Sequence, residues 1–243
     1  MLIRILTIIL TVFFLAGGRA EAQIAGPLDV VTEESAKPAV TPPERVAMLF
    51  YLLTGKTPDF KFWAHETPEY KNAAPVEKML VEKQQTERMK NNYTLLTRED
   101  QVIVEMPAMV SAYSEVGRGF FIENFKEDLF FPVIFTGENY ALVPQAIMDH
   151  QWVPAEGRQK MRDIETAAAG GKDRRLPLIL YLKPRSADGT SPATIEDTPF
   201  WLMSVEVKKM ELYTPDGAQL LWSSDEGKEK TNAQQQELLN LYH

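Results

Sequence analysis

The amino-acid sequence predicts an α+β fold, in which N-terminal helices precede a predominantly antiparallel, β-rich body with an inserted helix and a C-terminal helix. Two observations predict it. Helix-start signals concentrate before residue 92, whereas apolar residues alternate with polar ones after residue 97. The alternating runs are joined by links of hairpin length and not by regular helical crossovers, which favours antiparallel pairing over a doubly wound sheet.

Residues 1–22 have the order of a secretory signal peptide. Arg4 precedes an apolar run over residues 5–18, and Ala20 and Ala22 are the small residues expected before a cleavage point. As a helix the run would span about 21 Å, short of the ~30 Å hydrocarbon core, so a cleaved leader is favoured over an uncleaved anchor. We therefore expect a periplasmic or secreted protein with no membrane span after cleavage.

The remaining chain is expected to hold one folded domain. Residues 23–40 are small, polar and proline-bearing, without a helix or strand period, which is typical of a flexible leader. Residues 41–243 are predicted to form a single globular α+β domain, because their composition supports one sizeable core and shows no internal repeat.

Three helix starts are expected first. Thr41 and Glu44 form a capping box, and the helix that follows should end at Gly55. The segments 57–59 and 67–69 repeat the same start chemistry. A longer helix is expected from Pro75 to about residue 91, and its polar second half should face solvent or a partner.

Short strands are expected after this helix. The alternating or aromatic-rich runs cover residues 102–113, 120–125, 129–135, 140–143, 176–182, 200–213 and 219–222. Pro107 should force a bend or an edge position, and turns are expected at residues 117–119, 137–139 and 215–217. A helix over residues 154–169 interrupts the strands, residues 184–199 form the longest irregular stretch, and a second capping box at Thr231 predicts a final helix.

Composition excludes several kinds of chemistry. The formal charge is -8 at pH 7, whereas nucleic-acid binding requires a basic face. The chain has no cysteine, so disulfides, thiolate catalysis, iron–sulfur clusters and Cys-based zinc sites are excluded. We expect neither a nucleic-acid partner nor a cofactor.

Catalytic motifs are equally sparse. The three histidines are His65, His150 and His243, and no two of them have the spacing of a zinc protease. No Gly-x-Ser-x-Gly, Ser-x-x-Lys or phosphate-loop motif occurs. We therefore predict no catalytic residue and no metal site. A hydrolase that uses His65 or His150 with a distant carboxylate remains the alternative.

The aromatic side chains suggest a binding role. Seven of them fall within residues 120–140, enough for a core layer or for the wall of an apolar site. Adjacent pairs such as Phe120 and Phe121 would point to opposite faces of a strand, so one of each pair could remain exposed.

The leading hypothesis is an exported, non-catalytic protein of the bacterial periplasm that binds a protein partner or an envelope component. The leader, the helical lead-in and the aromatic hairpins are together similar to small exported bacterial proteins. The residues predicted to carry the binding are Phe121, Phe131 and Trp201, with Arg118 and Arg175 beside them, since aromatic and Arg side chains dominate contact energies. Carriage of an apolar small molecule is a further alternative, and the sequence leaves the oligomeric state open.

Overall fold

The computed structural model describes residues 37–225. The predicted signal peptide, most of the predicted leader, His243 and the predicted final helix lie outside the described residues. The remaining predictions can be compared with the structure element by element.

The described helices and strands include the predicted segments in the predicted order, together with two strands that were not predicted. The helices are α1 (Pro43–Thr54), α2 (Phe60–Glu66), α3 (Pro68–Asn72), α4 (Lys78–Thr94) and α5 (Arg158–Gly170), with short 3-10 turns η1 (Ile147–His150) and η2 (Lys172–Arg174). The strands are β1 (Val102–Met109), β2 (Gly119–Phe121), β3 (Phe131–Phe135), β4 (Glu138–Gln145), β5 (Trp152–Pro154), β6 (Arg175–Ala187), β7 (Ala193–Ile195), β8 (Thr198–Tyr213) and β9 (Leu220–Ser223). The two strands that were not predicted are β5 and β7.

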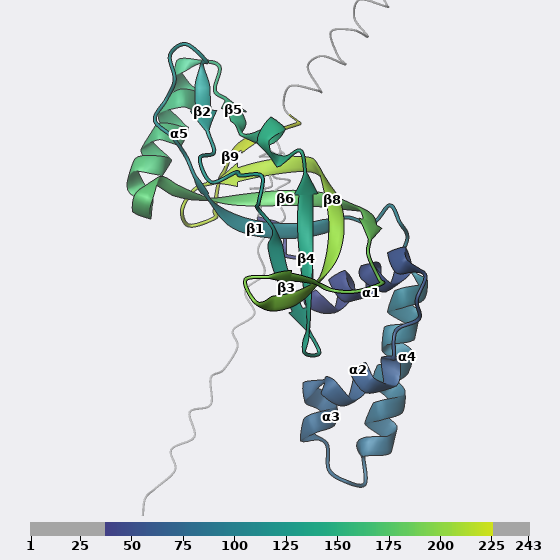
Figure 1. Ribbon diagram of the computed structural model, residues 1–243. Coiled ribbons are helices and arrows are strands. Elements are labelled where there is room, and N and C mark those ends of the chain that lie inside the picture. The colour runs from purple at the N-terminus through teal and green to yellow at the C-terminus, as the bar shows by residue number, and fades with distance from the viewer. Residues whose placement is uncertain (1–36, 226–243) are drawn as a thin grey trace, which may run out of the picture. The chain divides into compact units, whose positions relative to one another are not determined.

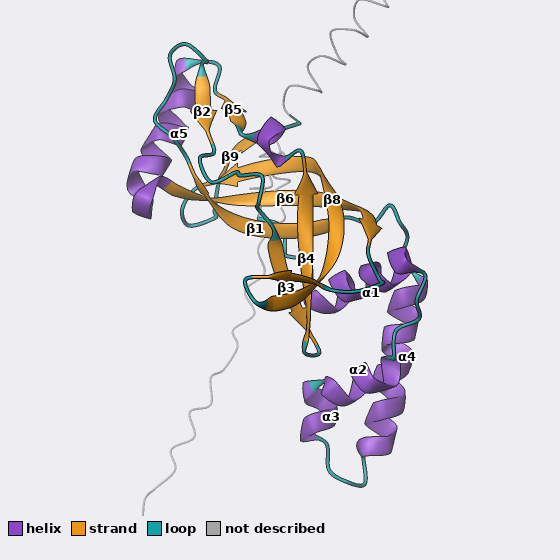
Figure 2. Cartoon of the chain, viewed as in Figure 1, coloured by secondary structure: helices purple, strands orange, loops and turns teal. Residues whose placement is uncertain are grey.

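One large sheet forms the body and confirms the predicted α+β class. Its order is β1-β6-β8-β4-β3, and β7 and β9 also pair with β8, while β2 and β5 form a separate two-stranded sheet (Figures 1 and 2). Pairing is antiparallel except between β4 and β8, which run parallel. The exception is possible because the chain between these two strands is long enough to cross over.

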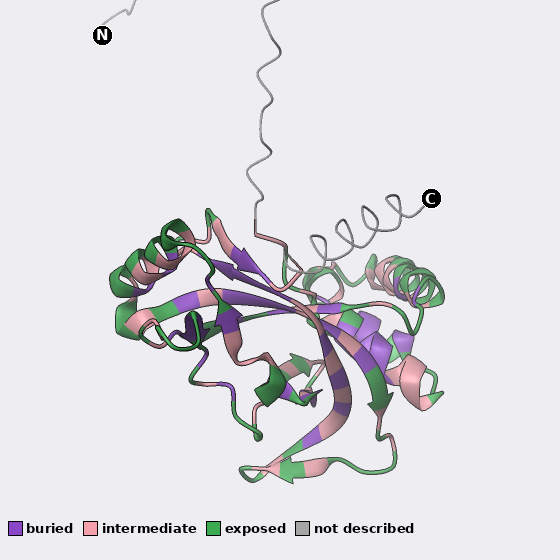
Figure 3. Ribbon diagram, turned by 90° about the horizontal axis from the view of Figure 1, so that it is seen from above, coloured by how far each residue is buried: buried purple, intermediate pink, exposed green. Residues whose placement is uncertain are grey.

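The longest strand, β8, changes its inward face partway along. Met203, Val205 and Val207 are buried, as the alternating sequence predicts. The register against β6 then shifts between Tyr181 and Leu182, and after this irregularity Met210 faces the core. Alternation in the sequence could not predict the shift. An extra residue in one strand moves every later side chain of that strand to the opposite face of the sheet. Figure 3 shows the alternating burial along the sheet.

Helix α1 packs against the sheet and closes the core. Residues 46–50 are buried, and the Phe50 ring contacts Tyr140 at 5.3 Å and Trp201 at 5.6 Å between centroids. Edge-on and tilted aromatic contacts of this kind each add about 0.5–1.5 kcal/mol beyond the burial of apolar area.

The predicted capping box at Thr41 is wrong. Helix α1 has Pro42 at its N-cap without a side-chain hydrogen bond. Thr41 instead extends the sheet: its hydroxyl accepts from the Ile103 N–H at 2.7 Å, and its own N–H donates to the Ile103 carbonyl at 2.9 Å. The predicted end is confirmed, because Gly55 has φ 69° and closes the helix in the left-handed conformation.

Helices α2, α3 and α4 pack on one another beside the sheet. Asp59 caps α2 and Thr67 caps α3, each by accepting a backbone N–H near the helix start. Helix α4 begins at Lys78, later than the predicted Pro75, and Met89 is its one buried residue. The polar second half was expected to face solvent or a partner; most of its residues are exposed, but Met89 lies in that half, whereas the apolar Met79 and Leu80 of the first half are exposed.

Two further predictions need correction. Residues 184–199 are not one irregular loop, because β6 continues to Ala187 and β7 pairs with the start of β8. The turn between β3 and β4 uses Thr136 and Gly137 and not residues 137–139, since β4 begins at Glu138. Pro107 lies on the edge strand β1, as predicted. Within residues 37–225, no helix combines the length and apolar character needed to cross a membrane.

Candidate interaction surface

The five predicted contact residues do not form one site. Phe121 lies on the small sheet of β2 and β5, and Arg118 lies in the turn just before β2. Phe131 begins the edge strand β3 and is 9% exposed. Trp201 lies on β8 and Arg175 at the start of β6.

Trp201 and Arg175 lie on the large sheet, away from β2 and β5. The half-buried Trp201 ring packs against Phe50, and the Lys56 ammonium lies 5.6 Å from its centroid. Arg175 lines a shallow groove of about 430 Å³ with Glu105, Pro107, Leu176, Pro177 and Pro215. Its two charged side chains, Glu105 and Arg175, stand among prolines and Leu176, and Glu105 is already paired with Lys37.

Arg118 and Phe121 belong to a surface that we call the aromatic lobe, defined as residues 111–122 with residues 151–155. Strand β2 pairs antiparallel with β5, which places Phe121 opposite Trp152. The two rings meet edge to face, with centroids 4.7 Å apart. Such cross-strand aromatic pairs stabilise a small sheet and leave one side of each ring available.

Phe120 and Phe121 divide between core and surface. Phe120 is fully buried and packs edge-on against Tyr113, whereas Phe121 is 46% exposed. The expectation that one member of an adjacent pair stays exposed is therefore confirmed at this position. Val116, at 99% exposure, and the exposed Arg118 occupy the same lobe.

The glycines on either side of Arg118 make room for Trp152. A Cβ atom on Gly117 would lie 2.4 Å from the Trp152 ring, and one on Gly119 would lie 2.6 Å from that ring and 2.4 Å from the Val153 carbonyl oxygen. All three distances are below any normal contact, so only glycine fits without a shift of the neighbouring atoms. The indole therefore lies against the backbone of the turn.

Ser114 holds this turn closed. Its N–H donates to the Gly119 carbonyl at 2.9 Å, and its own carbonyl accepts from Arg118 N–H at 2.7 Å. The hydroxyl of Ser114 also accepts the Gly117 N–H at 3.1 Å. Arg118 itself has φ 58°, an uncommon conformation for a residue with a side chain.

Arg174 connects the lobe to the sheet and to α5. Its guanidinium donates to both carboxylate oxygens of Glu165, to the Val110 carbonyl at 2.9 Å and to the Ser111 carbonyl at 2.8 Å. The hydrogen bond to Glu165 raises the pKa of Arg174 further. Arg174 therefore has a structural role at the start of β6.

Trp152 is the member of this surface that sequence reasoning missed. The signal that could have identified it is the pair Gly117 and Gly119, neither of which needs a positive φ. Glycines without that conformational need indicate close approach of another group.

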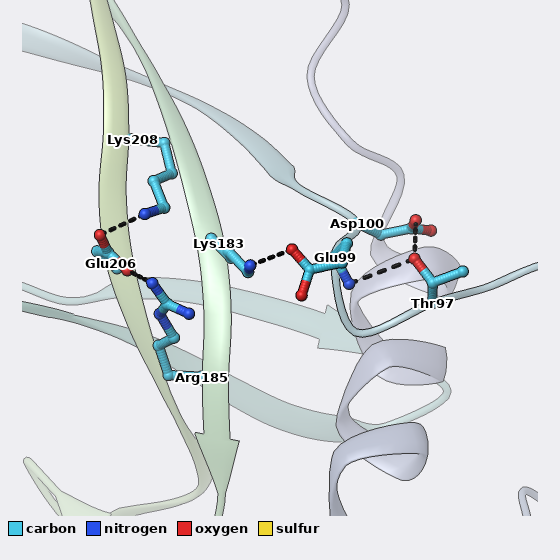
Figure 4. A network of polar contacts seen from close by, with 7 residues as sticks. All are labelled: Thr97, Glu99, Asp100, Lys183, Arg185, Glu206 and Lys208. Atoms are coloured by element: carbon cyan, nitrogen blue, oxygen red, sulfur yellow. Dashed lines mark hydrogen bonds and ion pairs between the residues drawn. The ribbon is translucent and has the colours of Figure 1, made fainter.

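Charged residues on the polar side of β6 and β8 are matched with one another (Figure 4). Glu206 lies between Arg185 and Lys208, and Lys183 binds Glu99 in the turn before β1. The hydrogen bond from Lys183 lowers the pKa of Glu99. The network thus joins the turn to the sheet, and its cations already have carboxylate partners.

His65, one of the two histidines considered for catalysis, contacts a carboxylate on α4. His65 Nε2 lies 2.6 Å from Glu82 Oε2, Lys61 binds the other oxygen at 3.1 Å, and the Tyr70 ring stacks on the imidazole. Hydrogen bonds from His65 and Lys61 lower the pKa of Glu82. The groove beside α2 is lined by Glu66 and Thr67 and not by this pair. His150 lies in η1, on a different part of the fold.

Within residues 37–225, no group of three His, Asp or Glu side chains is arranged to hold a metal ion. Comparisons with protein-family models, with curated proteins and with solved structures give no match to this chain. Its function is therefore inferred from its own side chains.

Proposed function

We propose that this protein is an exported, non-catalytic binding protein of the bacterial periplasm, which holds a protein partner or another envelope component against the aromatic lobe. The leader-like residues 1–22 support export. The absence of cysteine and of familiar catalytic motifs supports a binding role over a chemical one.

The exposure of Phe121 beside Trp152 is the observation that carries this proposal. A Phe side chain that is 46% exposed forgoes part of the favourable burial available to it, yet here it is held rigidly against an indole. Rigid aromatic side chains with an Arg nearby are the groups that contribute most to contact energies at protein interfaces. Arg118 is the Arg of this surface.

The lobe is also preorganised. Ser114 closes its turn, the two glycines seat Trp152, and Arg174 ties it to α5. Preorganisation lowers the entropy cost of association, because few side chains need to be ordered on binding.

Site-specific photocrosslinking tests the proposal. A photoreactive phenylalanine analogue is placed at Phe121 in cells that make the full chain, and crosslinked adducts are sought in the periplasmic fraction. Phe62 is the matched control, because it is 48% exposed on α2 and lies outside the lobe. We expect one adduct of defined mass from position 121 and none from position 62.

Substitution provides the second readout. Arg118→Ala should lower the yield of the position-121 adduct at least tenfold, which corresponds to about 1.4 kcal/mol. Equal adducts from positions 121 and 62, or no adduct from position 121 in folded protein, would count against the lobe as the binding surface.

The hydrolase alternative has one supporting observation, the 2.6 Å contact between His65 and Glu82. A His–carboxylate pair can activate water, but it must be presented to a substrate in a cleft. Lys61 and Tyr70 already contact the pair, so His65 and Glu82 help to hold α2, α3 and α4 together. The carrier alternative would require an enclosed apolar cavity, and the described grooves are open.

A further inference from the structure

A second surface, separate from the aromatic lobe, lies along the free edge of β3. The strand order ends at β3, so among the described residues this strand pairs only with β4. The sheet also ends at β1, where Thr41 covers the edge at Ile103. Unpaired edges are templates for another strand, and proteins usually cover them.

Two adjoining cavities follow this edge. One of about 340 Å³ is lined by Phe131–Ile134 on β3, by Val102 and Val104 on β1, and by residues 40–46. The other, of about 700 Å³, continues past Ile134 to Thr136 and is bounded by α2, α3 and Arg88 of α4. Pro43 and Ile134 line both cavities, so together they form one groove along the whole strand, which we call the β3 groove.

The backbone of β3 leaves hydrogen-bonding groups turned away from β4. Thr136 and Gly137 have φ 49° and 81°, which makes a two-residue turn of the hairpin type. Phe135 and Glu138 flank that turn, so they form a hydrogen-bonded pair, and the alternate residues Ile134 and Pro132 direct their backbone groups away from β4. Ile134 therefore offers an N–H and a carbonyl, and Pro132 offers a carbonyl.

Two side chains along β3 and its turn, Ile134 and Thr136, are not fully accommodated by the described structure. Ile134 is 66% exposed, although an edge isoleucine is costly to leave in water. At the end of the groove the Thr136 hydroxyl is buried without a hydrogen bond in the described structure. A β-branched residue at positive φ is a strained choice for this turn, and strain of this kind is concentrated at functional sites.

The charge of the groove indicates what would bind there. Glu44 is paired with Arg88, Glu66 with Lys71, and Glu105 with Lys37. Glu69 also interacts electrostatically with Arg88, which already pairs with Glu44. Four carboxylates thus face three cations, so the groove keeps a net negative charge on the side of Glu69. A cationic side chain on the incoming segment would complement it.

We infer that the β3 groove accepts an extended segment of a protein partner that carries alternating apolar and basic residues. The segment would pair with the backbone of β3, place apolar side chains beside Ile134 and bring a Lys or Arg to Glu69. The chain's own residues 23–36 fit less well, because Asp29, Glu33 and Glu34 give them the same charge as the rim. A second copy also fits less well, since residues 131–135 contain no basic side chain.

Fluorescence anisotropy with defined peptides tests the inference on the full chain. The probes are labelled nine-residue peptides of alternating valine and lysine, or of alternating valine and glutamate, and a third peptide that copies residues 23–36. We expect the valine–lysine peptide to bind at least tenfold more tightly than either of the others, with affinity that falls as salt rises. No binding up to about 1 mM, or equal binding of all three, would overturn the inference.

Variants at the edge sharpen the test. Ile134→Pro removes the outward N–H without touching the bonds to β4 and should weaken binding at least tenfold, whereas Ile134→Val should bind as the parent protein does. Glu69→Lys, an exposed substitution, should lower the affinity for the valine–lysine peptide and not the affinity for the valine–glutamate peptide. Unchanged binding in both Ile134→Pro and Glu69→Lys would refute the groove as the site.

Two other outcomes would assign the edge differently. Tighter binding of the 23–36 peptide would make the occupant the chain's own leader. A dimer seen in sedimentation, and lost in Ile134→Pro, would make the occupant a second copy of this chain. Either result would overturn the inference that a protein partner occupies the β3 groove. The inference is independent of the aromatic lobe, so Arg118→Ala should bind the valine–lysine peptide normally even if it loses the lobe crosslink.

Discussion

At the scale of single residues, small differences in position separate structural from exposed side chains. Phe120 and Phe121 are neighbours, yet only Phe121 reaches solvent, because adjacent strand residues face opposite sides of a sheet. Thr41 shows the same dependence on surroundings. Its local pattern favours a helix cap, but its hydroxyl instead accepts a hydrogen bond from the Ile103 N–H. A capping hydrogen bond contributes about 1 kcal/mol, which a bond to an otherwise unpaired strand edge can match.

Gly119 provides the first stability prediction. Gly119→Ala should lower the free energy of unfolding by about 1–3 kcal/mol, because the new methyl would overlap the Val153 carbonyl, and a backbone atom cannot move aside cheaply. Urea denaturation measures the change. Gly170→Ala is the control: it ends α5 with open space around it and should be neutral or stabilise by up to about 1 kcal/mol. Equal effects of the two substitutions would show that the Trp152 packing is not tight.

At the scale of whole elements, strand and helix periodicities predict where segments form better than how they pair. β8 was expected as a half-buried strand, and it is one, but the irregularity opposite Tyr181 and Leu182 turns Met210 inward. β2 was expected to form a hairpin with the strand before it. Instead its main partner is β5, and only isolated bridges connect it to the chain before the turn.

Helix α4 depends on one buried side chain, which gives the second prediction. Met89→Ala should cost about 2–4 kcal/mol, because it removes the only fully buried apolar group of a helix that is otherwise polar. Hydrogen exchange of the α4 amides should accelerate with it. Met79→Ala on the same helix is the control, since Met79 is 82% exposed and its loss should change stability by no more than about 0.5 kcal/mol. If both variants behave alike, α4 is held by its contacts with α2 and not by Met89.

At the scale of the whole molecule, β8 organises the sheet. It pairs with β4, β6, β7 and β9, so segments far apart in sequence become neighbours through it. Near its end Glu211 is 6% exposed and accepts hydrogen bonds from Tyr181 at 2.8 Å and Tyr213 at 3.0 Å, with Lys209 at 2.8 Å. Burial alone would raise the pKa of Glu211, but these donors outweigh burial and lower it.

A lowered carboxyl pKa gives a stability that depends on pH, which is the third prediction. Since the folded pKa of Glu211 lies below its unfolded value of about 4.3, the contribution is complete above that value and disappears as pH falls through the folded pKa. Glu211→Gln should therefore lower the free energy of unfolding at pH 7 by about 1–3 kcal/mol. Its curve should converge with that of the parent protein as the pH falls below 4. Denaturant titrations at several pH values measure both curves, and parallel curves would contradict the assignment. Glu99→Gln, at an exposed ion pair, is the control.

The sequence by itself determined the α+β class, the end of α1 at Gly55, the edge position of Pro107 and the turn before β9, because each depends on local backbone preferences or on periodicity within one segment. Only the tertiary structure decided that β4 runs parallel to β8, that Trp152 lies against Gly117 and Gly119, and that β1 and β3 line a common groove. These are contacts between segments distant in the chain. Their energies depend on which surfaces meet, and local sequence patterns do not contain that information.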